Sequence, residues 1–469
     1  MNNKPSFIIN LFAFSLPFTA FGIINTADFG IDLSLSLAVL LAGKYIVDTL
    51  VLRKRMTVDR IDKLILFFLF IAFISIIFAA FDDLADRYRM FKQIVLLAIY
   101  CILFLHLKRH FSSNPGSLLS CIKYYIFSAY FAILFGVYQF LSGMFRLPYP
   151  HSLLNSAYNA SMGEEKRLLI YDVSAGGFDR VESVFIEPGT FALFLLGCIP
   201  LFYCIAISKA RFPFNNQPSN KILFPLSIFV MLLTFSLAGY VGLCLAVVVF
   251  LLSQAKDRKV LKKLNIKNSK IIFLIFSILV IVSVFFSNTE FMARIYRIPV
   301  RKAENFIKSA NINERDKQGK STIALLQTIV TTGEIVRRRP FWGAGYGNFQ
   351  SYFEIYAPHW AMMRVNYVAG TSVFCRILAE TGILGAVVFS WFFIALLRKS
   401  YFSIKNIRDA GLYLILKGVW LSLVCYSINF LFIRCSNITW PQFWFLLGLV
   451  GAVSSLRVEK GEGNETKPI

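Results

Sequence analysis

Long apolar stretches separated by short polar segments dominate this chain from near its first residue almost to its last. Most stretches are about 17 to 25 residues long, enough for a helix rising 1.5 Å per residue to cross a hydrocarbon core of about 30 Å. The pattern predicts an all-α, polytopic integral membrane protein with about twelve transmembrane helices. The expected spans are residues 8–25, 31–52, 64–81, 93–107, 118–141, 185–208, 222–236, 239–254, 271–287, 370–397, 411–433 and 440–456.

The apolar stretch from Ile222 to Ser253 is too long for one comfortable span and has Ser236 and Gly239 near its middle. We interpret it as two short helices joined by a tight external turn. A single tilted helix would exchange the sides of the other loops and expose the basic segment Lys256 to Lys270 to the outside.

Basic residues gather in five of the connections: Arg53 to Lys63, Lys108 to Lys123, Lys209 to Lys221, Lys256 to Lys270 and Arg398 to Arg408. The positive-inside rule places these connections and both termini in the cytoplasm. Two large loops, at about 142–184 and 288–369, then face outward. We expect one membrane domain over residues 1–456, a disordered cytoplasmic tail at 457–469, and an external helix at 321–338 lying on the membrane.

The formal net charge of +23 does not indicate nucleic acid binding, because the basic residues are spread among the loops and form no RNA- or DNA-binding motif. The eight cysteines lie mostly within or beside apolar spans, without a CxxC pair, and the four histidines divide between the two predicted sides. We expect neither a disulfide framework nor a metal site, and no cofactor.

Arginines accumulate in the external loops, against the positive-inside trend. An arginine offers a planar fork of donors that grips phosphate oxygens and stays charged near a membrane, so an anionic partner such as a lipid diphosphate is expected on that face. Each arginine alone is equally well explained by contact with lipid head groups or with nearby glutamates. The cluster comprises Arg180, Arg294, Arg297, Arg301, Arg315, Arg337, Arg338, Arg339 and Arg364.

A charged segment that includes Arg180 and Glu187 leads directly into the sixth span. Pro188 suits the first turn of a helix, whose free amides can face an anion. Glu187 is a candidate catalytic residue, or it only caps the helix dipole.

The second segment, from Arg337 to Phe349, has glycines at three alternate positions, which permit a tight backbone path and close approach to a ligand. Trp342 and Tyr346 can stack on sugar rings or belong to the interfacial aromatic belt. In the third segment, Arg376 and Glu380 are four residues apart and share a helix face at the entry to the tenth span. Ionisable groups at that depth turn toward a pathway, or toward each other as an ion pair.

These segments occur in the order that is typical of the O-antigen polymerase and ligase superfamily, which the chain resembles. The resemblance rests on Arg180 with Glu187-Pro188, on Trp342-Gly343-Ala344-Gly345-Tyr346-Gly347-Asn348-Phe349 after Pro340, and on Ile377-Leu378-Ala379-Glu380-Thr381-Gly382-Ile383-Leu384-Gly385. A weaker segment, Ser236-Leu237-Ala238-Gly239-Tyr240, stands where the family often has Ser-Arg. The resemblance covers residues 178 to 386, and the first five spans match only in hydropathy.

The resemblance implies a metal-independent glycosyltransferase in the bacterial inner membrane, whose substrate is an undecaprenyl-diphosphate-linked oligosaccharide and whose surroundings are membrane lipids. A chain-length regulator protein is a further partner that it suggests. Arg180, Arg338 and Arg376 would bind the diphosphate, and Glu187, His359 or Glu380 would receive the acceptor proton.

Ligases of the superfamily commonly have His-Asn where this chain has Thr371-Ser372, so the resemblance favours a Wzy-type polymerase. His359 lies twelve residues upstream and replaces that histidine only if the loop folds back. A twelve-helix transporter or flippase fits the composition equally well, although no halfway repeat is visible.

Overall fold

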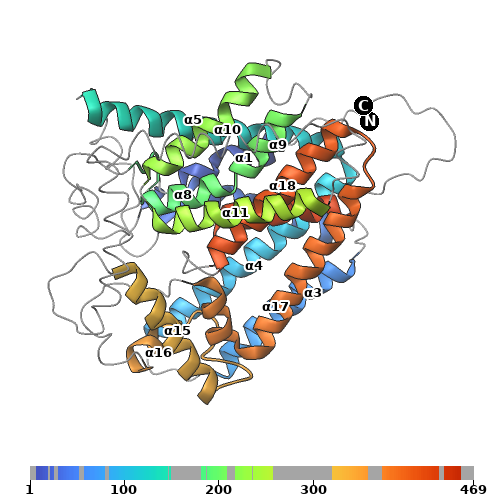
Figure 1. Ribbon diagram of the computed structural model, residues 1–469. Coiled ribbons are helices and arrows are strands. Elements are labelled where there is room, and N and C mark those ends of the chain that lie inside the picture. Colours follow the sequence, from blue (N-terminus) through green and yellow to red (C-terminus); the bar gives the residue numbers. More distant parts are fainter. Residues whose placement is uncertain are drawn as a thin grey trace.

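The computed structural model describes residues 7–19, 22–25, 30–51, 58–79, 84–145, 147–148, 181–185, 187–208, 217–234, 236–256, 320–356, 372–431 and 438–455. In this part of the chain the fold is almost entirely helical (Figure 1). Its elements are α1 (Phe7–Ser15), η1 (Leu16–Phe18), β1 (Gly22–Asn25), β2 (Gly30–Asp32), α2 (Leu33–Leu50), α3 (Arg60–Ile77), α4 (Leu84–Ser113), α5 (Pro115–Phe145), α8 (Pro188–Leu196), α9 (Ile199–Ile207), α10 (Gln217–Leu233), α11 (Leu237–Lys256), α15 (Lys320–Arg338), α16 (Phe349–Tyr356), α17 (Val373–Lys405), α18 (Ala410–Asn429) and α19 (Pro441–Ser455).

Six of these segments are long and apolar enough to cross a membrane, and four further apolar helices are shorter. The six are Leu33–Leu50, Asp86–Ser113, Pro115–Ser142, Pro188–Ile207, Val373–Lys405 and Ala410–Asn429. A membrane protein with several spans is therefore confirmed, while the count of twelve stays a prediction. The expected span 271–287 and the tail 457–469 lie outside the described residues.

Several expected spans differ from the structure: the fourth, expected at 93–107, is the longer helix α4 from Leu84 to Ser113, and two others are interrupted. The first helix ends early, since Pro17 falls in a 3₁₀ turn and residues 22–25 form a short antiparallel pair with β2. The sixth span is divided into α8 and α9 at Gly197 and Cys198, and Pro200, which has no amide hydrogen to donate, is the second residue of α9. Gln442 of α19 donates to Phe194 O at 3.1 Å, which satisfies a carbonyl near this break.

The division of Ile222–Ser253 into two helices is confirmed, because α10 ends at Leu233 and α11 begins at Leu237. Within the connection, Thr234 N donates to Met231 O at 3.2 Å. The Tyr240 hydroxyl donates to Leu232 O at 2.7 Å and joins the two helices.

One end of the bundle collects the start of α1, the start of α3, the junction of α4 with α5 and the ends of α17 and α19; we call it the terminal end. Two hydrogen bonds lie at this end: one joins Asn10 to Ser120, and the other joins Ser403 to Ser454. The loop end is the opposite one, where Ser372 before α17 donates to Leu431 O after α18. The basic segments around Asp59, Lys108 and Lys399 therefore share one end of the molecule.

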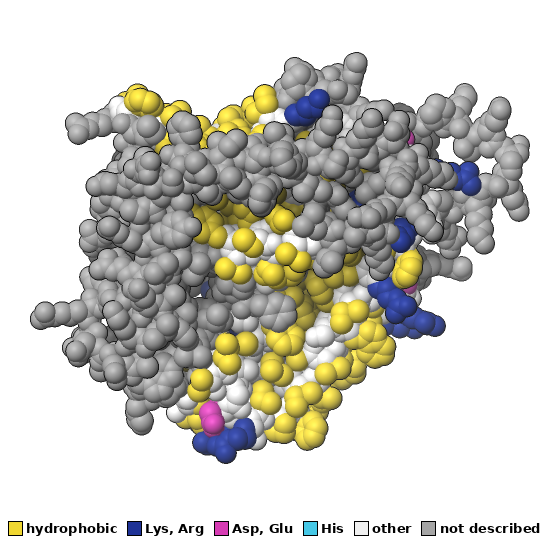
Figure 2. Space-filling model, in the orientation of Figure 1, with side chains coloured by type: hydrophobic (Ala, Val, Ile, Leu, Met, Phe, Trp, Pro, Cys, Tyr) yellow, Lys and Arg dark blue, Asp and Glu magenta, His cyan; other side chains and the backbone are white. Residues whose placement is uncertain are grey.

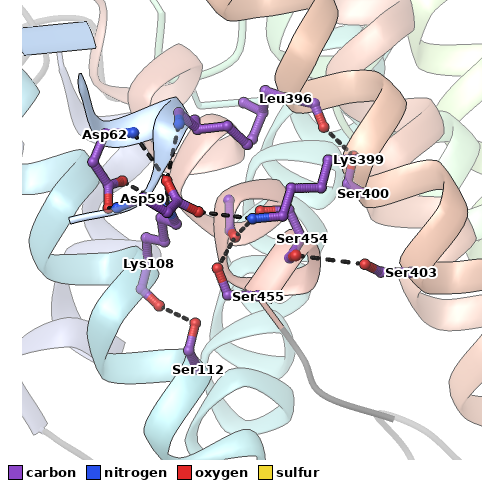
Figure 3. Close-up of polar contacts among 12 residues, drawn as sticks. Asp59, Asp62, Lys108, Ser112, Leu396, Lys399, Ser400, Ser403, Ser454 and Ser455 are labelled. Carbon is purple, nitrogen blue, oxygen red and sulfur yellow. Dashed lines mark hydrogen bonds and ion pairs between the residues drawn. The ribbon is translucent and has the colours of Figure 1, made fainter. Parts of the chain in front are cut away.

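An ion cluster ties three helices together at the terminal end (Figure 3). Lys108 of α4, whose side chain is only 7% exposed, lies 2.8 Å from Asp59 and 2.5 Å from Asp62 at the start of α3. Lys399 of α17 contacts the other oxygen of Asp59 at 2.7 Å. Asp59 and Asp62 also form a reciprocal capping box, which explains why α3 begins at Arg60.

Candidate functional site

The glycine-rich segment between α15 and α16, residues 339–348, docks on a break in α17. Gly382 has φ 65° and ψ −170°, so the helical hydrogen bonds across this residue are lost. Ala379 O and Glu380 O instead accept from Ala344 N at 2.8 Å and Gly345 N at 3.0 Å, and Ile383 N donates to Pro340 O at 2.8 Å. The second and third sequence segments are thus two halves of one interlocked structure.

The glycines of this loop are required by close protein contacts. Gly343, Gly345 and Gly347 all have positive φ. A β-carbon on Gly343 would overlap Ala379 O, and one on Gly382 would overlap Phe341 O. The close approach expected for a ligand is therefore made here by neighbouring protein atoms.

The loop also contacts the end of α3. Tyr346 N donates to Ser75 Oγ at 3.0 Å, and the Trp342 ring stacks on Phe78 with centroids 5.1 Å apart. Tyr346 is 3% exposed and packs in the core, where burial raises the pKa of its hydroxyl well above the ordinary value. Of the two aromatic residues predicted to bind glycan, only Trp342 is partly exposed.

Arg376 and Glu380 form an ion pair inside this structure. Arg376 Nε lies 2.7 Å from Glu380 Oε1, and the two side chains are 14% and 3% exposed. The same carboxylate oxygen accepts from Phe349 N at 3.3 Å, at the first residue of α16. Glu380 thus holds the guanidinium of Arg376 and the N-terminus of α16 together, as expected for an anion at a helix start.

Three more arginines of the predicted external cluster, Arg337, Arg338 and Arg339, lie at the end of α15, and the last two lie over rings of α16. Arg337 and Arg338 contact Glu334 at 3.0 and 3.8 Å. Arg338 lies over the Tyr356 ring at 4.4 Å from its centroid, and Arg339 over Tyr352 at 5.2 Å. The two described arginines that were predicted to bind the diphosphate thus lie on different helices. Arg338 is on the last turn of α15, and Arg376 is on the first turn of α17.

The first sequence segment is described from Val181 onward; Arg180 and His359 lie outside the described residues. Val181 N donates to Leu233 O at 3.1 Å, which anchors the residue after Arg180 to the end of α10. Glu187 occupies the N-cap position of α8, where its backbone carbonyl accepts from the helix and its side chain makes no capping hydrogen bond.

Gln139 and Ser183 stabilise this segment, and the sequence argument did not single them out. Gln139 Oε1 accepts from the amides of Glu182 at 3.0 Å and Ser183 at 2.8 Å. Ser183 adopts φ 56° and donates to Ala132 O at 2.6 Å. The available signal was a polar glutamine inside an apolar span, because such residues normally face a protein partner.

Comparison with known proteins gives one family match. Residues 222–390 match the Wzy_C family, described as O-antigen ligase. This range runs from α10 into α17, so it contains the glycine loop and the Arg376–Glu380 pair. None of the curated proteins compared with the chain matches it.

Proposed function

The chain belongs to the O-antigen polymerase and ligase superfamily, and we propose that it polymerises lipid-diphosphate-linked repeat units of O-antigen or a related surface polysaccharide. The observation that carries the proposal is the ion pair of Arg376 with the buried Glu380 beside the glycine loop, inside the family match. A guanidinium fixed in this manner is suited to a diphosphate leaving group.

In the proposed reaction, a sugar hydroxyl of one repeat attacks the anomeric carbon of the growing chain. The new C–O bond forms as the bond to the diphosphate breaks, and undecaprenyl diphosphate leaves with the bonding electrons. Arg180 and Arg376 stabilise the charge that develops on this leaving group. Arg338, which lies over the Tyr356 ring at the exposed end of α15, is not assigned to this step. The acceptor proton passes to a carboxylate or imidazole.

The contacts of Glu380 favour a supporting role for it over proton transfer. One of its oxygens already accepts from Arg376 and from Phe349 N, and both interactions hold the carboxylate in a fixed position. We therefore propose that Glu380 positions Arg376, and that Glu187 or His359 receives the proton. Trp342 is the proposed sugar-stacking residue, whereas Tyr346 holds the loop.

We place this chemistry at the periplasmic face of the inner membrane, with twelve spans, external loops at about 142–184 and 288–369, and both termini in the cytoplasm. The grouping of basic segments at the terminal end supports this orientation, because Lys108 and Lys399 meet at Asp59. The glycine loop and Arg376 lie at the loop end. A chain-length regulator remains a proposed partner.

The second candidate is an O-antigen ligase, since that is the description of the matching family. Thr371-Ser372 stands where ligases commonly have His-Asn, and this favours polymerisation. The two reactions differ in their acceptor: another lipid-linked repeat for a polymerase, and lipid A-core for a ligase.

The test uses the purified protein in nanodiscs with defined lipid-linked repeats and no ion gradient. A polymerase gives a ladder of longer lipid-linked products; a ligase extends only added lipid A-core, and a flippase gives neither product. Failure of the wild-type protein to lengthen the repeats would exclude polymerisation.

Arginine variants then locate the diphosphate site. Arg376→Lys keeps the charge but loses the fork, so the rate should fall at least tenfold with normal protein abundance. Arg180→Lys should also lose most polymer, and Arg180→Ala at least as much. Arg408→Lys is the matched control, because Arg408 is exposed after α17 at the terminal end. Normal polymer from an expressed Arg180→Ala protein would remove Arg180 from the mechanism.

A further inference from the structure

Helix α15 has two different faces. One face is buried and includes Thr328, Thr331 and Ile335. On the same face the Thr332 hydroxyl donates a hydrogen bond to Cys375 O of α17. On the other side Ile329 is 49% exposed and Val330 37% exposed. The threonines thus pack against protein beside Ile335, while the large apolar side chains of Ile329 and Val330 face outward, a position that water does not favour.

The exposed apolar surface continues beyond α15. Phe341, just after the helix, is 63% exposed, and Ile355 of α16 is 57% exposed. Phe341 adjoins Trp342, which stacks on the exposed Phe78 at the end of α3. Through Phe78 the surface joins the outward faces of α3 and α17, which are apolar along their length.

Charge borders this surface at one edge. Figure 2 shows hydrophobic side chains covering the described surface over α17, with basic side chains and one acidic side chain at the lower edge, where Figure 1 draws α15. Arg337 and Arg338 have 71% and 52% exposed side chains and share Glu334 as their acidic neighbour. The apolar face and these arginines are arranged as in helices that lie at a membrane surface.

We propose that a membrane rim, defined as Ile329, Val330, Phe341 and Ile355 with Arg337 and Arg338, lies in the head-group region and binds anionic phospholipid. The apolar side chains reach the acyl boundary, and the two guanidinium groups contact lipid phosphate. α15 is then an interfacial helix that fixes the glycine loop at the depth of the head groups.

Two observations favour lipid over a protein partner. The apolar part of the rim is continuous with the outward faces of α3 and α17, which a spanning protein presents to acyl chains. Its polar border is cationic, complementary to anionic phosphate. A second copy of the chain would carry the same arginines and would repel the rim unless it docked through another surface.

Three glycines provide matched probe positions, because a β-carbon at Gly43, Gly116 or Gly333 meets nothing within 4 Å. Gly333 lies on the exposed face of α15, Gly43 within the candidate span α2, and Gly116 at the exposed start of α5. Each is changed to cysteine and spin-labelled after replacement of Cys244, Cys375 and Cys435. Five cysteines remain, and all five are buried.

Collision with dissolved oxygen and with a water-soluble nickel chelate is measured in nanodiscs containing phosphatidylglycerol. The spin label at Gly43 should collide mainly with oxygen, and the label at Gly116 mainly with the nickel chelate. The ratio of the two collision rates at Gly333 should be intermediate. A Gly333 label as accessible to nickel as Gly116 would overturn the proposal. So would spin–spin broadening at Gly333, which would indicate a second copy.

The arginines are tested by Arg337→Gln with Arg338→Gln in the Gly333→Cys protein. In phosphatidylglycerol the nickel accessibility at Gly333 should rise at least twofold in this variant, whereas in phosphatidylcholine the two proteins should agree. Equal accessibility in both lipids would remove the anionic lipid from the proposal. Native mass spectrometry provides a second measurement: the parent protein should retain phosphatidylglycerol that the variant loses. Neither readout depends on polymerase activity, so the proposal is tested independently of the proposed function.

Discussion

The interlock between the glycine loop and α17 makes Gly382→Ala the most informative single change in this protein. Gly382 has φ 65° and ψ −170°, a conformation essentially restricted to glycine, and a β-carbon there would overlap Phe341 O. Alanine must therefore change the backbone, push the loop away from α17, or do both.

The expected loss follows from these contacts. Holding alanine in this conformation costs about 1–3 kcal/mol. Separating the loop from α17 weakens three backbone hydrogen bonds, from Ala344 N, Gly345 N and Ile383 N, at about 1 kcal/mol each. We expect Gly382→Ala to lower the free energy of unfolding by about 4–6 kcal/mol, a large fraction of a typical total.

Gly333→Ala is the control, because it should raise the free energy of unfolding where Gly382→Ala lowers it. Gly333 is exposed in the middle of α15, and its β-carbon would meet nothing within 4 Å. Alanine has higher helix propensity than glycine, so this variant should gain about 0.5–1 kcal/mol. The two glycines look alike in the sequence, yet the free energies of unfolding of the two alanine variants should differ by about 4.5–7 kcal/mol.

Unfolding by sodium dodecyl sulfate in mixed micelles, followed by circular dichroism, gives both free energies. Gly382→Ala should also lower polymer synthesis at a temperature where it stays folded, because the first turns of α17 carry Arg376. A Gly382→Ala protein as stable as Gly333→Ala would refute the account of the interlock.

The remaining predictions concern the ion cluster and the topology. Lys108→Met should cost about 3–5 kcal/mol because it leaves the buried carboxylate of Asp62 without its ammonium partner. Lys399→Met removes a side chain that is 45% exposed, so it should cost no more than about 1 kcal/mol in the same titration. Burial would raise the pKa of Asp59, but hydrogen bonds from Lys108 and Lys399 outweigh it and hold that pKa below the ordinary value. The stability that Asp59 contributes is therefore fully present above its unfolded pKa of about 4, and it is lost as the pH drops toward the lower folded pKa. Asparagine at this position does not titrate. Between pH 5 and 2 the melting temperature should therefore fall less in Asp59→Asn than in wild type. With native thiols masked, a cysteine at Asn313 should react with an impermeant reagent in intact spheroplasts and one at Asn265 only after lysis; the reverse pattern would overturn the topology.

The sequence alone determined the class of protein and the positions of most helices. Apolar runs long enough to cross a bilayer must satisfy their backbone groups internally, so hydropathy predicts helices directly. Ile222 to Ser253 shows this well, because the positive-inside rule required two helices there and the structure has α10 and α11. The order of the three motifs also indicated the family that residues 222–390 match.

The spacing of Arg376 and Glu380 placed them on one helix face and left an ion pair as one of two alternatives, and the structure has the ion pair. The Phe349 amide, which also donates to Glu380, is 31 residues away, and no periodicity indicates that contact.

Only the tertiary structure decided what the glycines and arginines contact. Gly343 and Gly382 are almost forty residues apart, yet each leaves room for the backbone beside the other, and this depends on how the loop docks on α17. Arg338 and Arg376 looked equivalent as phosphate ligands, but one lies on Tyr356 and the other is held by Glu380. Local patterns fix helices and same-face pairs, whereas contacts between distant segments depend on the packing of the whole bundle.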